Sequence, residues 1–419
     1  MRIIADLHIH SRFARATSKE LTIPNVAEWA KIKGLNLMGT GDFTHPAWFN
    51  EMKENFVLSP SGFYHLKEDK TPIYFVPTAE VASIYTQGNK LRRIHLVIIA
   101  PTLEAVKKIN TKLADLGVNL YSDGRPITGI PAKILVKIIL EIEPKSLIIP
   151  AHIWTPWFAI LGSKSGFDSV EECFEEMTPY IFALETGLSS DPEMNWRLAA
   201  LDKYTLISNS DAHSLGNLGR EANVFELPDD EFTYDNFWKI IKTKDRNRFK
   251  YTVEFYPEEG MYHFDGHRNC KGGTTFPPEE SKKLNNICPV CNRELTIGVM
   301  HRVADLADRP TGFIPDKAIP ARKLIPLDEI IAQAIQKNTG TKAVQNEYQN
   351  FINLFGPEYP ALLDVNLEKI RKSHPQIAEG IFRVRTGKLT IKPGYDGTYG
   401  KVEIFGNDAL PANQQQALF

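Results

Sequence analysis

The first 225 residues contain seven short apolar runs, and each of them carries or ends at a His, Asp or Glu. Helical patterns separate most of these runs, such as the segment that begins after Pro24 and stops at Gly34. Alternating strands and helices are typical of an α/β fold with parallel strands. In (β/α) barrels the carboxyl ends of the strands converge on one face. The sequence therefore predicts a barrel in which these polar side chains meet at a single mouth.

The first apolar run continues into DLHIHS, which places two histidines one residue apart. Side chains alternate between the faces of a strand, so Asp6, His8 and His10 should project to the same side. A polar, solvent-facing strand would show the same alternation. The recurrence of such residues on the later runs favours a metal site instead. The further candidates on those runs are Asp42, Glu80, His95, His152, Glu185, Asp211 and His213.

The chemistry of these side chains limits the metals that could bind. Imidazole together with carboxylate suits zinc, manganese or iron better than calcium, which prefers oxygen ligands alone. The candidate ligands are His8, His10, Asp42, Glu80, His95, His152, Asp211 and His213. They exceed the needs of one ion, so we expect two or more, with Glu80 available to bridge. Closely spaced ions activate water and stabilise both oxygens of an in-line displacement at phosphorus.

A second set of metal-type residues occurs in HFDGHRNC and CPVC. His267-x2-Cys270 is followed after 17 residues by Cys288-x2-Cys291. Two such pairs supply four ligands for a tetrahedral structural zinc. The intervening segment is rich in Lys, Gly, Pro and Glu, so metal rather than an apolar core would stabilise it. His263 is an alternative fourth ligand, and three unpaired cysteines in a loop are the alternative without a metal.

The length of 419 residues exceeds what one ordinary core accommodates and predicts two or three domains. We expect a catalytic barrel over 1–245 and a zinc-binding module over 246–310. A mainly helical C-terminal domain, with a short β end and a flexible tail, should cover 311–419.

The composition is that of a soluble globular protein, with 42% hydrophobic and 24% charged residues. A formal net charge of −2 excludes a wholesale polycation but allows a local basic groove. The sequence contains no run of about 18 apolar residues, so we expect no membrane span. We also expect no signal peptide, because the sequence opens directly on a predicted strand. Four cysteines, three of them close together in the sequence, are too few for a disulfide framework, so we expect a cytoplasmic protein. Cys173 lies apart in a helical pattern and should be a buried small hydrophobe.

Five motifs, DLHIHS, PTAEV, RRIH, IIPAH and SDAH, occur in this order, and the first part of the chain resembles the PHP superfamily. The resemblance implies a distorted seven-stranded (β/α) barrel with a two- or three-metal centre. It carries the role of metal ligand onto His8, His10, Glu80, His95, His152, Asp211 and His213.

Two positions depart from the pattern of that superfamily. In TGDFTHP, Asp42 stands where a histidine is usual, with His45 as the alternative ligand. No further histidine follows the H-x-H motif in SRFARATSK. Both missing histidines belong to the third metal site. The resemblance therefore implies two divalent ions of zinc, manganese or magnesium type and leaves a third site open.

Segments beyond the barrel extend the resemblance over nearly the full length. They are GTGDFTHPAW, ALETGLSSDPEMNWRL, YHFDGHRNC with CPVC, LTIGVMHRVADLADR and PGYDGTYGKV, and they resemble the endonuclease Q family of DNA repair enzymes of archaea and some bacteria. The resemblance implies cleavage, by metal-activated water, on the 5′ side of a deaminated base (hypoxanthine, uracil or xanthine) or an abasic site. A PHP-type small-molecule phosphomonoesterase and a catalytically inert DNA-binding scaffold are the alternatives.

A nuclease that acts beside one abnormal base must flip that nucleotide out and read its edge. Aromatic side chains supply stacking planes and a wedge, and small polar side chains after the sixth run could read the base edge. The candidates for DNA contact are Trp48, Trp154, Trp157, Ser189, Ser190, Asn195 and Arg197. Glu185 would orient a ligand or a water.

The end of the chain offers two further surfaces. A phosphate-contacting groove or a solvated charged face could be formed by Arg383, Arg385, Lys388, Lys392 and Lys401. The final NQQQALF is similar to the short peptides that bind a sliding clamp, through Gln416, Leu418 and Phe419. A sliding clamp is therefore a candidate partner besides DNA.

Overall fold

A computed structural model gives the structure of the chain and describes residues 1–69, 73–270 and 273–406. Its largest sheet contains, in spatial order, β16 (Ala321–Lys323), β13 (Phe249–Glu254), β12 (Ala222–Glu226), β1 (Arg2–Asp6), β2 (Leu37–Gly39), β5 (Tyr74–Val76), β4 (Tyr64–Leu66) and β3 (Phe56–Leu58). The pairs β1–β2 and β2–β5 are parallel. β12 runs antiparallel to both β1 and β13, so the sheet is mixed.

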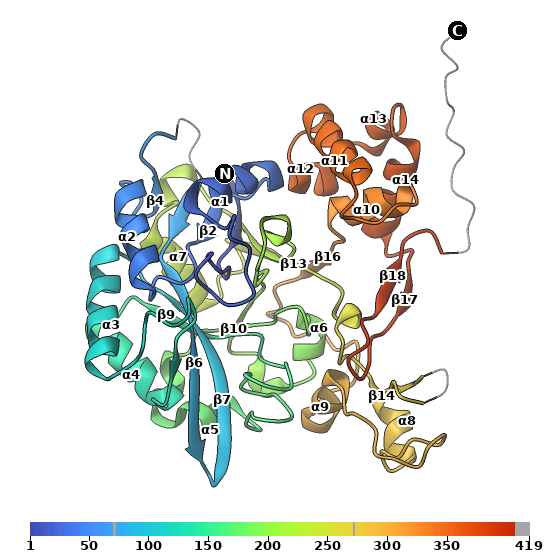
Figure 1. Ribbon diagram of the computed structural model, residues 1–419, viewed down its shortest axis with the longest axis horizontal. Coiled ribbons are helices and arrows are strands. Elements are labelled where there is room, and N and C mark those ends of the chain that lie inside the picture. The colour runs from blue at the N-terminus through green and yellow to red at the C-terminus, as the bar shows by residue number, and fades with distance from the viewer. Residues whose placement is uncertain (70–72, 271–272, 407–419) are drawn as a thin grey trace.

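The second sheet contains, in order, β8 (Ile127–Thr128), β6 (Thr78–Gln87), β7 (Lys90–Ile99) and β9 (Leu147–Pro150). β6 and β7 form a long antiparallel hairpin that projects from the body of the molecule (Figure 1). Its turn residues Gly88 and Asn89 have φ angles of 60° and 57°. Two successive left-handed residues match the twist of a two-residue hairpin. The chain therefore reverses directly between these two apolar runs, without an intervening helix.

A parallel pair, β10 (Ala183–Glu185) and β11 (Thr205–Ile207), completes the N-terminal strands. A parallel bridge between Ile9 and Ala212 joins the segments that follow β1 and β11. The mixed α/β class is confirmed. The hydrogen-bonded ladders are divided among separate sheets and include antiparallel pairs, so a single closed seven-stranded barrel stays a prediction.

Helices surround these strands on the outer side of the N-terminal part (Figure 1). They are α1 (Ile23–Lys33), α2 (Pro46–Asn55), α3 (Leu103–Asp115), α4 (Ala132–Ile142), α5 (Val170–Phe174), α6 (Pro192–Asn195) and α7 (Tyr234–Thr243). Short 3₁₀ helices are η1 (Glu175–Tyr180), η2 (Ala199–Leu201), η3 (Leu215–Asn217), η4 (Asp229–Glu231) and η5 (Pro257–Glu259). α1 begins where the Thr22 side chain accepts a hydrogen bond from the Asn25 N–H, and it ends at Gly34 with a φ of +83°. Glycine adopts this left-handed conformation without strain.

The rest of the chain forms two groups of elements (Figure 1). The first contains β14 (Asp265–His267), β15 (Thr274–Phe276), α8 (Pro278–Lys283) and α9 (Val299–Leu306). The second contains α10 (Leu327–Ala334), α11 (Lys342–Phe355), α12 (Glu358–Leu363), α13 (Leu367–Arg371) and α14 (Pro375–Thr386). β17 (Thr390–Lys392) and β18 (Lys401–Glu403) form an antiparallel hairpin that lies between the two groups in this view.

The packing of the apolar interior explains why the residues that follow β1 are buried. Alternate residues of β1 pack into two different apolar clusters: Ile3 and Ala5 belong to one, and Ile4 belongs to the other. β1 is therefore covered on both faces, and the residues that follow it lie inside the protein. Within the described residues, none of the helices has the length and apolar character that crossing a membrane requires.

Candidate metal centre

Six of the predicted ligands form two groups of three at the inner ends of the N-terminal strands. His8, His10 and Asp211 make up one group, and Glu80, His95 and His152 make up the other. Within each group the possible ligand atoms all lie within 4.8 Å of one another. The strands bring them together from five places in the chain. His8 and His10 follow β1, His152 follows β9, and Asp211 follows β11, whereas Glu80 and His95 lie within β6 and β7.

The carboxylate of Glu80 lies between the two groups. Its Oε1 is 2.6 Å from His95 Nδ1 and 3.1 Å from His152 Nε2. Its Oε2 is 3.4 Å from His10 Nε2 and 3.7 Å from His8 Nε2. Ligands about 2.1 Å from a tetrahedral ion are separated from one another by about 3.4 Å. Glu80 therefore has one carboxylate oxygen near each group and could contribute to holding divalent ions at both.

The outer ring nitrogens of the first two histidines are bound by buried carboxylates. His10 Nδ1 is 3.0 Å from Asp42 Oδ1, and His8 Nδ1 is 3.0 Å from Glu185 Oε1. Both Nε2 atoms are buried without a hydrogen-bond partner, as is Asp211 Oδ1. Buried polar atoms normally have partners, and a carboxylate that orients a metal-bound histidine is a recurring arrangement. The unpartnered atoms and the donor set thus fit divalent metal ions.

This geometry changes the interpretation of Asp42. Asp42 was expected among the ligands, but its oxygens accept hydrogen bonds from His10 and from the Ser11 N–H, and it belongs to neither ligand group. Glu185 likewise accepts from Asn209 Nδ2 at 2.8 Å and from the His152 N–H at 2.9 Å. Both carboxylates therefore hold candidate ligands in orientation, which was the role expected of Glu185.

The electrostatics of the centre favour charged pairs. Burial disfavours the charged form of His8, but the carboxylates of Glu185 and Glu80 outweigh it and keep the pKa of His8 well above its ordinary value. Burial also opposes ionisation of Glu80, yet His95 and the other histidines keep its pKa well below the ordinary value. Burial lowers the pKa of His95 to about 4, so this imidazole is neutral. Ionised carboxylate and neutral imidazole are the ligand forms that metals need, so Glu80 and His95 are ready to bind, whereas His8 would release a proton when an ion binds.

Three residues of the centre have left-handed backbone conformations. The φ angles are 46° for Asp42, 31° for His152 and 47° for Asp211. Residues other than glycine rarely adopt such angles, and surrounding contacts must enforce them. For Asp211 the enforcing contacts come from Asp6, whose carboxylate accepts hydrogen bonds from the N–H and hydroxyl of Ser210. Burial raises the pKa of Asp6 to about 6.

The third metal site is not assembled among the described residues. His213 lies beside the centre, with its ring centroid 4.6 Å from that of His10, but it belongs to neither ligand group. Its Nδ1 is 2.8 Å from the backbone oxygen of Asp211. His45, the alternative ligand, stacks on Phe13 at 4.4 Å.

The cysteine-rich segment forms a separate compact group. His267 Nδ1 is 3.0 Å from both Cys270 Sγ and Cys291 Sγ, and Cys270 Sγ is 3.4 Å from Cys288 Sγ. These four side chains form the third possible metal-binding group of the described residues. His263, the alternative fourth ligand, does not belong to this group. The donor set of three thiols and one imidazole is that of a structural zinc site.

Most of the residues expected to contact DNA are buried. The Trp48 indole donates to the Gly41 oxygen at 2.9 Å, and the Trp154 indole donates to Asn195 Oδ1 at 2.9 Å. Ser190 and Asn195 are fully buried and Arg197 is nearly so. Burial argues against direct contact between these side chains and DNA. Trp157 is 42% exposed and Ser189 is partly exposed, so these two can reach a ligand.

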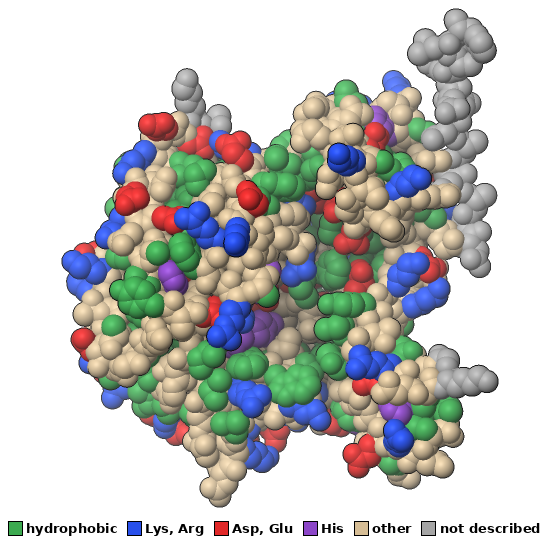
Figure 2. Space-filling model, viewed as in Figure 1, with side chains coloured by type: hydrophobic (Ala, Val, Ile, Leu, Met, Phe, Trp, Pro, Cys, Tyr) green, Lys and Arg blue, Asp and Glu red, His purple; other side chains and the backbone are tan. Residues whose placement is uncertain are grey.

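A hollow of about 640 Å³ begins next to His152. The hydroxyl of Thr155, which lines it, is 3.1 Å from His152 Nδ1. Trp157 and Ser189 line the hollow from the N-terminal part, while Tyr262 and Tyr399 line it from later in the chain. On the face shown in Figure 2, histidine side chains are visible near the centre, with Lys and Arg side chains beside them.

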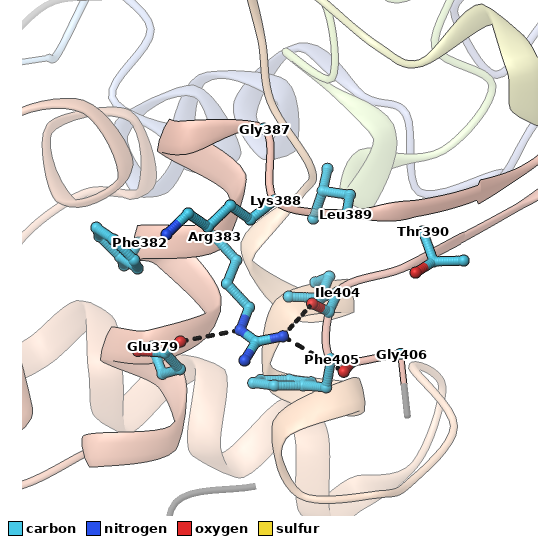
Figure 3. A pocket seen from close by; sticks show the side chains of 10 residues that line it. All are labelled: Glu379, Phe382, Arg383, Gly387, Lys388, Leu389, Thr390, Ile404, Phe405 and Gly406. Atoms are coloured by element: carbon cyan, nitrogen blue, oxygen red, sulfur yellow. Dashed lines mark hydrogen bonds and ion pairs between the residues drawn. The ribbon is translucent and has the colours of Figure 1, made fainter. Parts of the chain in front are cut away.

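A further hollow of about 450 Å³ lies between α14 and the β17–β18 hairpin (Figure 3). The guanidinium of Arg383 is 2.9 Å from Glu379 and also donates to the Ile404 oxygen. Arg385 donates to three backbone oxygens of 361–365. Lys392 and Lys401 both pair with Glu403. Arg383 and Arg385 thus stabilise the C-terminal part through internal hydrogen bonds, whereas Lys392 and Lys401 remain largely exposed, so a phosphate-contacting groove stays a prediction.

The sequence pattern did not predict one residue of the centre. Arg125 Nη1 donates to Glu80 Oε2 at 3.0 Å, which places a cation at the edge of both ligand groups. It precedes the two-residue strand β8 and belongs to no motif, so nothing in the sequence pattern indicated its position. Asp6 had been placed on the metal-facing side of β1, whereas its carboxylate anchors the loop of Asp211.

Fold and site together define a mixed α/β protein with a histidine–carboxylate centre suited to divalent metals. Residues 326–388 match the family described as the MJ0043 C-terminal domain. The chain is 35% identical over 272 residues to MJ0043 of Methanocaldococcus jannaschii, covering 63% of this chain and 34% of that protein. It thus spans about a third of the length of that curated relative.

Two solved structures resemble nearly the whole chain. The lesion-specific endonuclease PfuEndoQ from Pyrococcus furiosus is 33% identical, with a TM-score of 0.84 and coverage of 96% of this chain and 95% of that one. Endonuclease Q in complex with a 27-mer duplex substrate, with an abasic lesion at the active site, is 33% identical, with a TM-score of 0.83 and coverage of 96% of each chain. The chain belongs to the endonuclease Q family.

Proposed function

We propose that the protein is a metal-dependent DNA repair endonuclease that hydrolyses the phosphodiester on the 5′ side of a deaminated base or an abasic site. The products would carry 3′-hydroxyl and 5′-phosphate ends. The observation that carries the proposal is the position of Glu80, which belongs to one group of three candidate ligands and also reaches His10 of the other group, at 3.4 Å. A related protein of the family is solved with abasic duplex DNA at its active site, which supports DNA as the substrate here.

The chain's own residues would prepare this chemistry. The two ligand groups would hold divalent ions of zinc, manganese or magnesium type, which supply Lewis acidity and an activated water. Glu185 and Asp42 fix the ring orientation of His8 and His10, so that each presents Nε2 to the centre. Asp6 anchors the loop that carries Asp211. This support lets the ligands form the centre without rearrangement.

The hollow beside His152 is the proposed place where an abnormal base is read. Trp157 and Tyr262 meet edge to face, with ring centroids 6.1 Å apart, and offer an aromatic surface. Deamination replaces an amino donor on the base by a carbonyl acceptor. The hydroxyl of Ser189 can donate to such a carbonyl, whereas an abasic site needs no such bond. Changing Ser189 to Ala should therefore slow cleavage beside uracil and leave cleavage beside an abasic site unchanged.

The parts of the chain after the N-terminal catalytic region would have supporting roles. We infer that His267, Cys270, Cys288 and Cys291 bind one structural zinc, which supports the module expected over 246–310. The boundaries of the domains expected over 1–245 and 311–419 stay predictions, as does the cytoplasmic location. Clamp binding through Gln416, Leu418 and Phe419 also stays a prediction, because these residues lie outside the described part of the chain.

The test is cleavage of a 5′-labelled duplex with one deoxyuridine, beside an undamaged duplex, in Mn²⁺. We expect one cut on the 5′ side of the lesion, lost in the Asp211→Ala variant. Asp235→Ala is the matched control, because Asp235 pairs with Lys145 on the surface. Equal cutting of both duplexes, or none of either, would contradict the proposal.

The same reaction distinguishes the two other functions. A small-molecule phosphomonoesterase would leave both duplexes intact and hydrolyse p-nitrophenyl phosphate in the same buffer. An inert scaffold would bind the duplex without hydrolysing either substrate. Both alternatives lack an observation that favours them.

A further inference from the structure

Arg125 is the one Lys or Arg that forms an ion pair with a member of the two ligand groups, within the described residues. Its Nη1 is 3.0 Å from Glu80 Oε2. That oxygen already faces His10 Nε2 at 3.4 Å, and the other carboxylate oxygen faces His95 and His152. Both oxygens of Glu80 therefore already have histidine neighbours in the ligand groups. Arg125 adds a positive charge that is not required to hold the Glu80 carboxylate in place.

The backbone of Arg125 is fixed by its neighbours. Asp123 Oδ1 accepts hydrogen bonds from the Arg125 N–H at 3.2 Å and from the Arg15 N–H at 3.1 Å. The Gly124 N–H donates to the Phe13 oxygen at 3.0 Å. A side chain at Gly124 would clash with Asp42, so this loop packs directly on the residue that orients His10. The guanidinium is thus placed from a rigid loop.

The guanidinium itself is only partly used. An arginine has five N–H donors in a planar fork, and one of those of Arg125 makes the hydrogen bond described above. The side chain is 27% exposed, so part of it is accessible to a ligand that enters the centre. A planar fork of donors matches the oxygens of a phosphate and can bind two of them at once.

We propose that Arg125 is a catalytic residue that donates hydrogen bonds to the non-bridging oxygens of the scissile phosphate. This inference rests on the proposed function. In the hydrolysis, the oxygen of water bonds to phosphorus and the bond between phosphorus and the 3′ oxygen breaks. One proton of that water is released and the 3′ oxygen takes up one proton. Negative charge gathers on the phosphate oxygens in the transition state, and Arg125 stabilises that charge.

The competing explanation is that Arg125 only positions Glu80 as a ligand. The two roles differ in their effect on metal binding. A guanidinium near the centre repels divalent ions, so its removal should leave Mn²⁺ affinity unchanged or increase it if Arg125 acts on the phosphate. If Arg125 positions Glu80, its removal should weaken Mn²⁺ binding, and excess Mn²⁺ should restore cleavage.

The experiment compares Arg125→Ala and Arg125→Lys with Arg248→Ala, which removes a surface arginine paired with Glu231. Single-turnover cleavage of the deoxyuridine duplex at saturating enzyme should fall by about 100- to 1,000-fold in Arg125→Ala. Arg125→Lys should recover part of this loss, because it keeps the charge and loses the fork. Arg248→Ala should cleave like the wild type.

Two binding measurements complete the test. Mn²⁺ affinity by titration calorimetry should not weaken in Arg125→Ala. The same variant should bind a 5′-phosphorylated product duplex about 10-fold more weakly than the wild type, while the unphosphorylated duplex binds equally. Weaker Mn²⁺ binding, with cleavage restored by excess Mn²⁺, would overturn the catalytic role. A wild type that does not cut at the lesion would instead overturn the proposed function itself.

Discussion

The two metal-type sites of this chain are built in opposite ways. The histidine–carboxylate centre collects its ligands from His8 to Asp211, on segments that large apolar clusters already support. The cysteine-containing site collects its ligands from His267 to Cys291 alone. Around it, the buried apolar cluster consists of Cys270, Cys288 and Leu295, two of which belong to the candidate zinc site itself. The fold thus assembles the first site, whereas the region around the second would depend on a bound metal ion.

This difference predicts different consequences of losing metal. The centre has its ligands in place through hydrogen bonds to buried carboxylates, so an ion binds there without folding the chain. Among the described residues, the cysteine site is supported by short backbone hydrogen bonds and by three buried cluster members, so the binding free energy of a metal there would be largely folding free energy. Removing metal should therefore cost activity at the first site and local structure at the second.

The largest effect is expected from losing a ligand of the centre. Asp211→Ala removes the carboxylate that lies 3.1 Å from His10 Nε2. Losing a partner of a ligand typically costs 10- to 100-fold in metal affinity or activity, and losing the ligand itself should cost more than about 100-fold. Cleavage of the deoxyuridine duplex measures the loss. As a control, the variant should give a far-UV circular dichroism spectrum like that of the wild type, which shows that the fold is intact. A variant that still cleaves the duplex would contradict the role of the histidine–carboxylate centre in activity.

The next effect is expected at the cysteine site. Structural zinc in zinc-finger peptides contributes about 10–16 kcal/mol of apparent binding free energy, so Cys288→Ser should lose zinc and unfold the surrounding segment. Limited proteolysis should then cut near 265–298 while the N-terminal part stays protected. The matched control is Cys173→Ser, which should keep zinc because Cys173 lies outside the group. Retained zinc with unchanged proteolysis in the Cys288 variant would count against the site.

A smaller effect is expected from the carboxylates that orient His10 and His8. Asp42→Asn and Glu185→Gln preserve shape but weaken the hydrogen bonds to the imidazole rings. Each should reduce Mn²⁺ affinity by about 10- to 100-fold and leave the zinc content unchanged. Calorimetric titration with Mn²⁺ measures the affinity. If Asp42→Asn abolished Mn²⁺ binding altogether, Asp42 would be a ligand, as the sequence first indicated.

The smallest effect concerns thiol reactivity. Burial raises the pKa of Cys173 to about 12, so this thiol stays protonated and unreactive at neutral pH. The native protein should show no reactive thiol at this position in a titration with Ellman's reagent. After chelation the three cysteines of the zinc-type site should react, while Cys173 should react only in denaturant. Early modification of Cys173 would show that its surroundings open with the metal site.

The ligand groups were predictable because the same residue types recur on successive apolar runs, and strand ends converge. The part played by Asp42 was not predictable, because it depends on which ring nitrogen of His10 faces the centre. Arg125 follows from no pattern, since its loop reaches Glu80 only through tertiary packing.

Residue type alone misled the prediction of DNA contacts. Trp48 and Trp154 were expected to stack on bases, but each completes the core and donates its indole N–H to a buried oxygen. A tryptophan next to a functional motif can face either the ligand or the core, and sequence does not distinguish the two. The barrel was misjudged in one place for a related reason. The sequence pattern placed helices between most of the apolar runs, and the Gly88–Asn89 turn instead joins two of them directly as a hairpin.

The most direct test of the central claim is graded removal of metal with two readouts on one sample. Samples are incubated with increasing chelator, and each is measured for cleavage of the deoxyuridine duplex and for protease resistance of the 265–298 segment. The account predicts that cleavage is lost first and returns on adding Mn²⁺, while the segment stays resistant until zinc is released. Simultaneous loss of both, with no recovery of cleavage in Mn²⁺, would contradict two sites with separate roles.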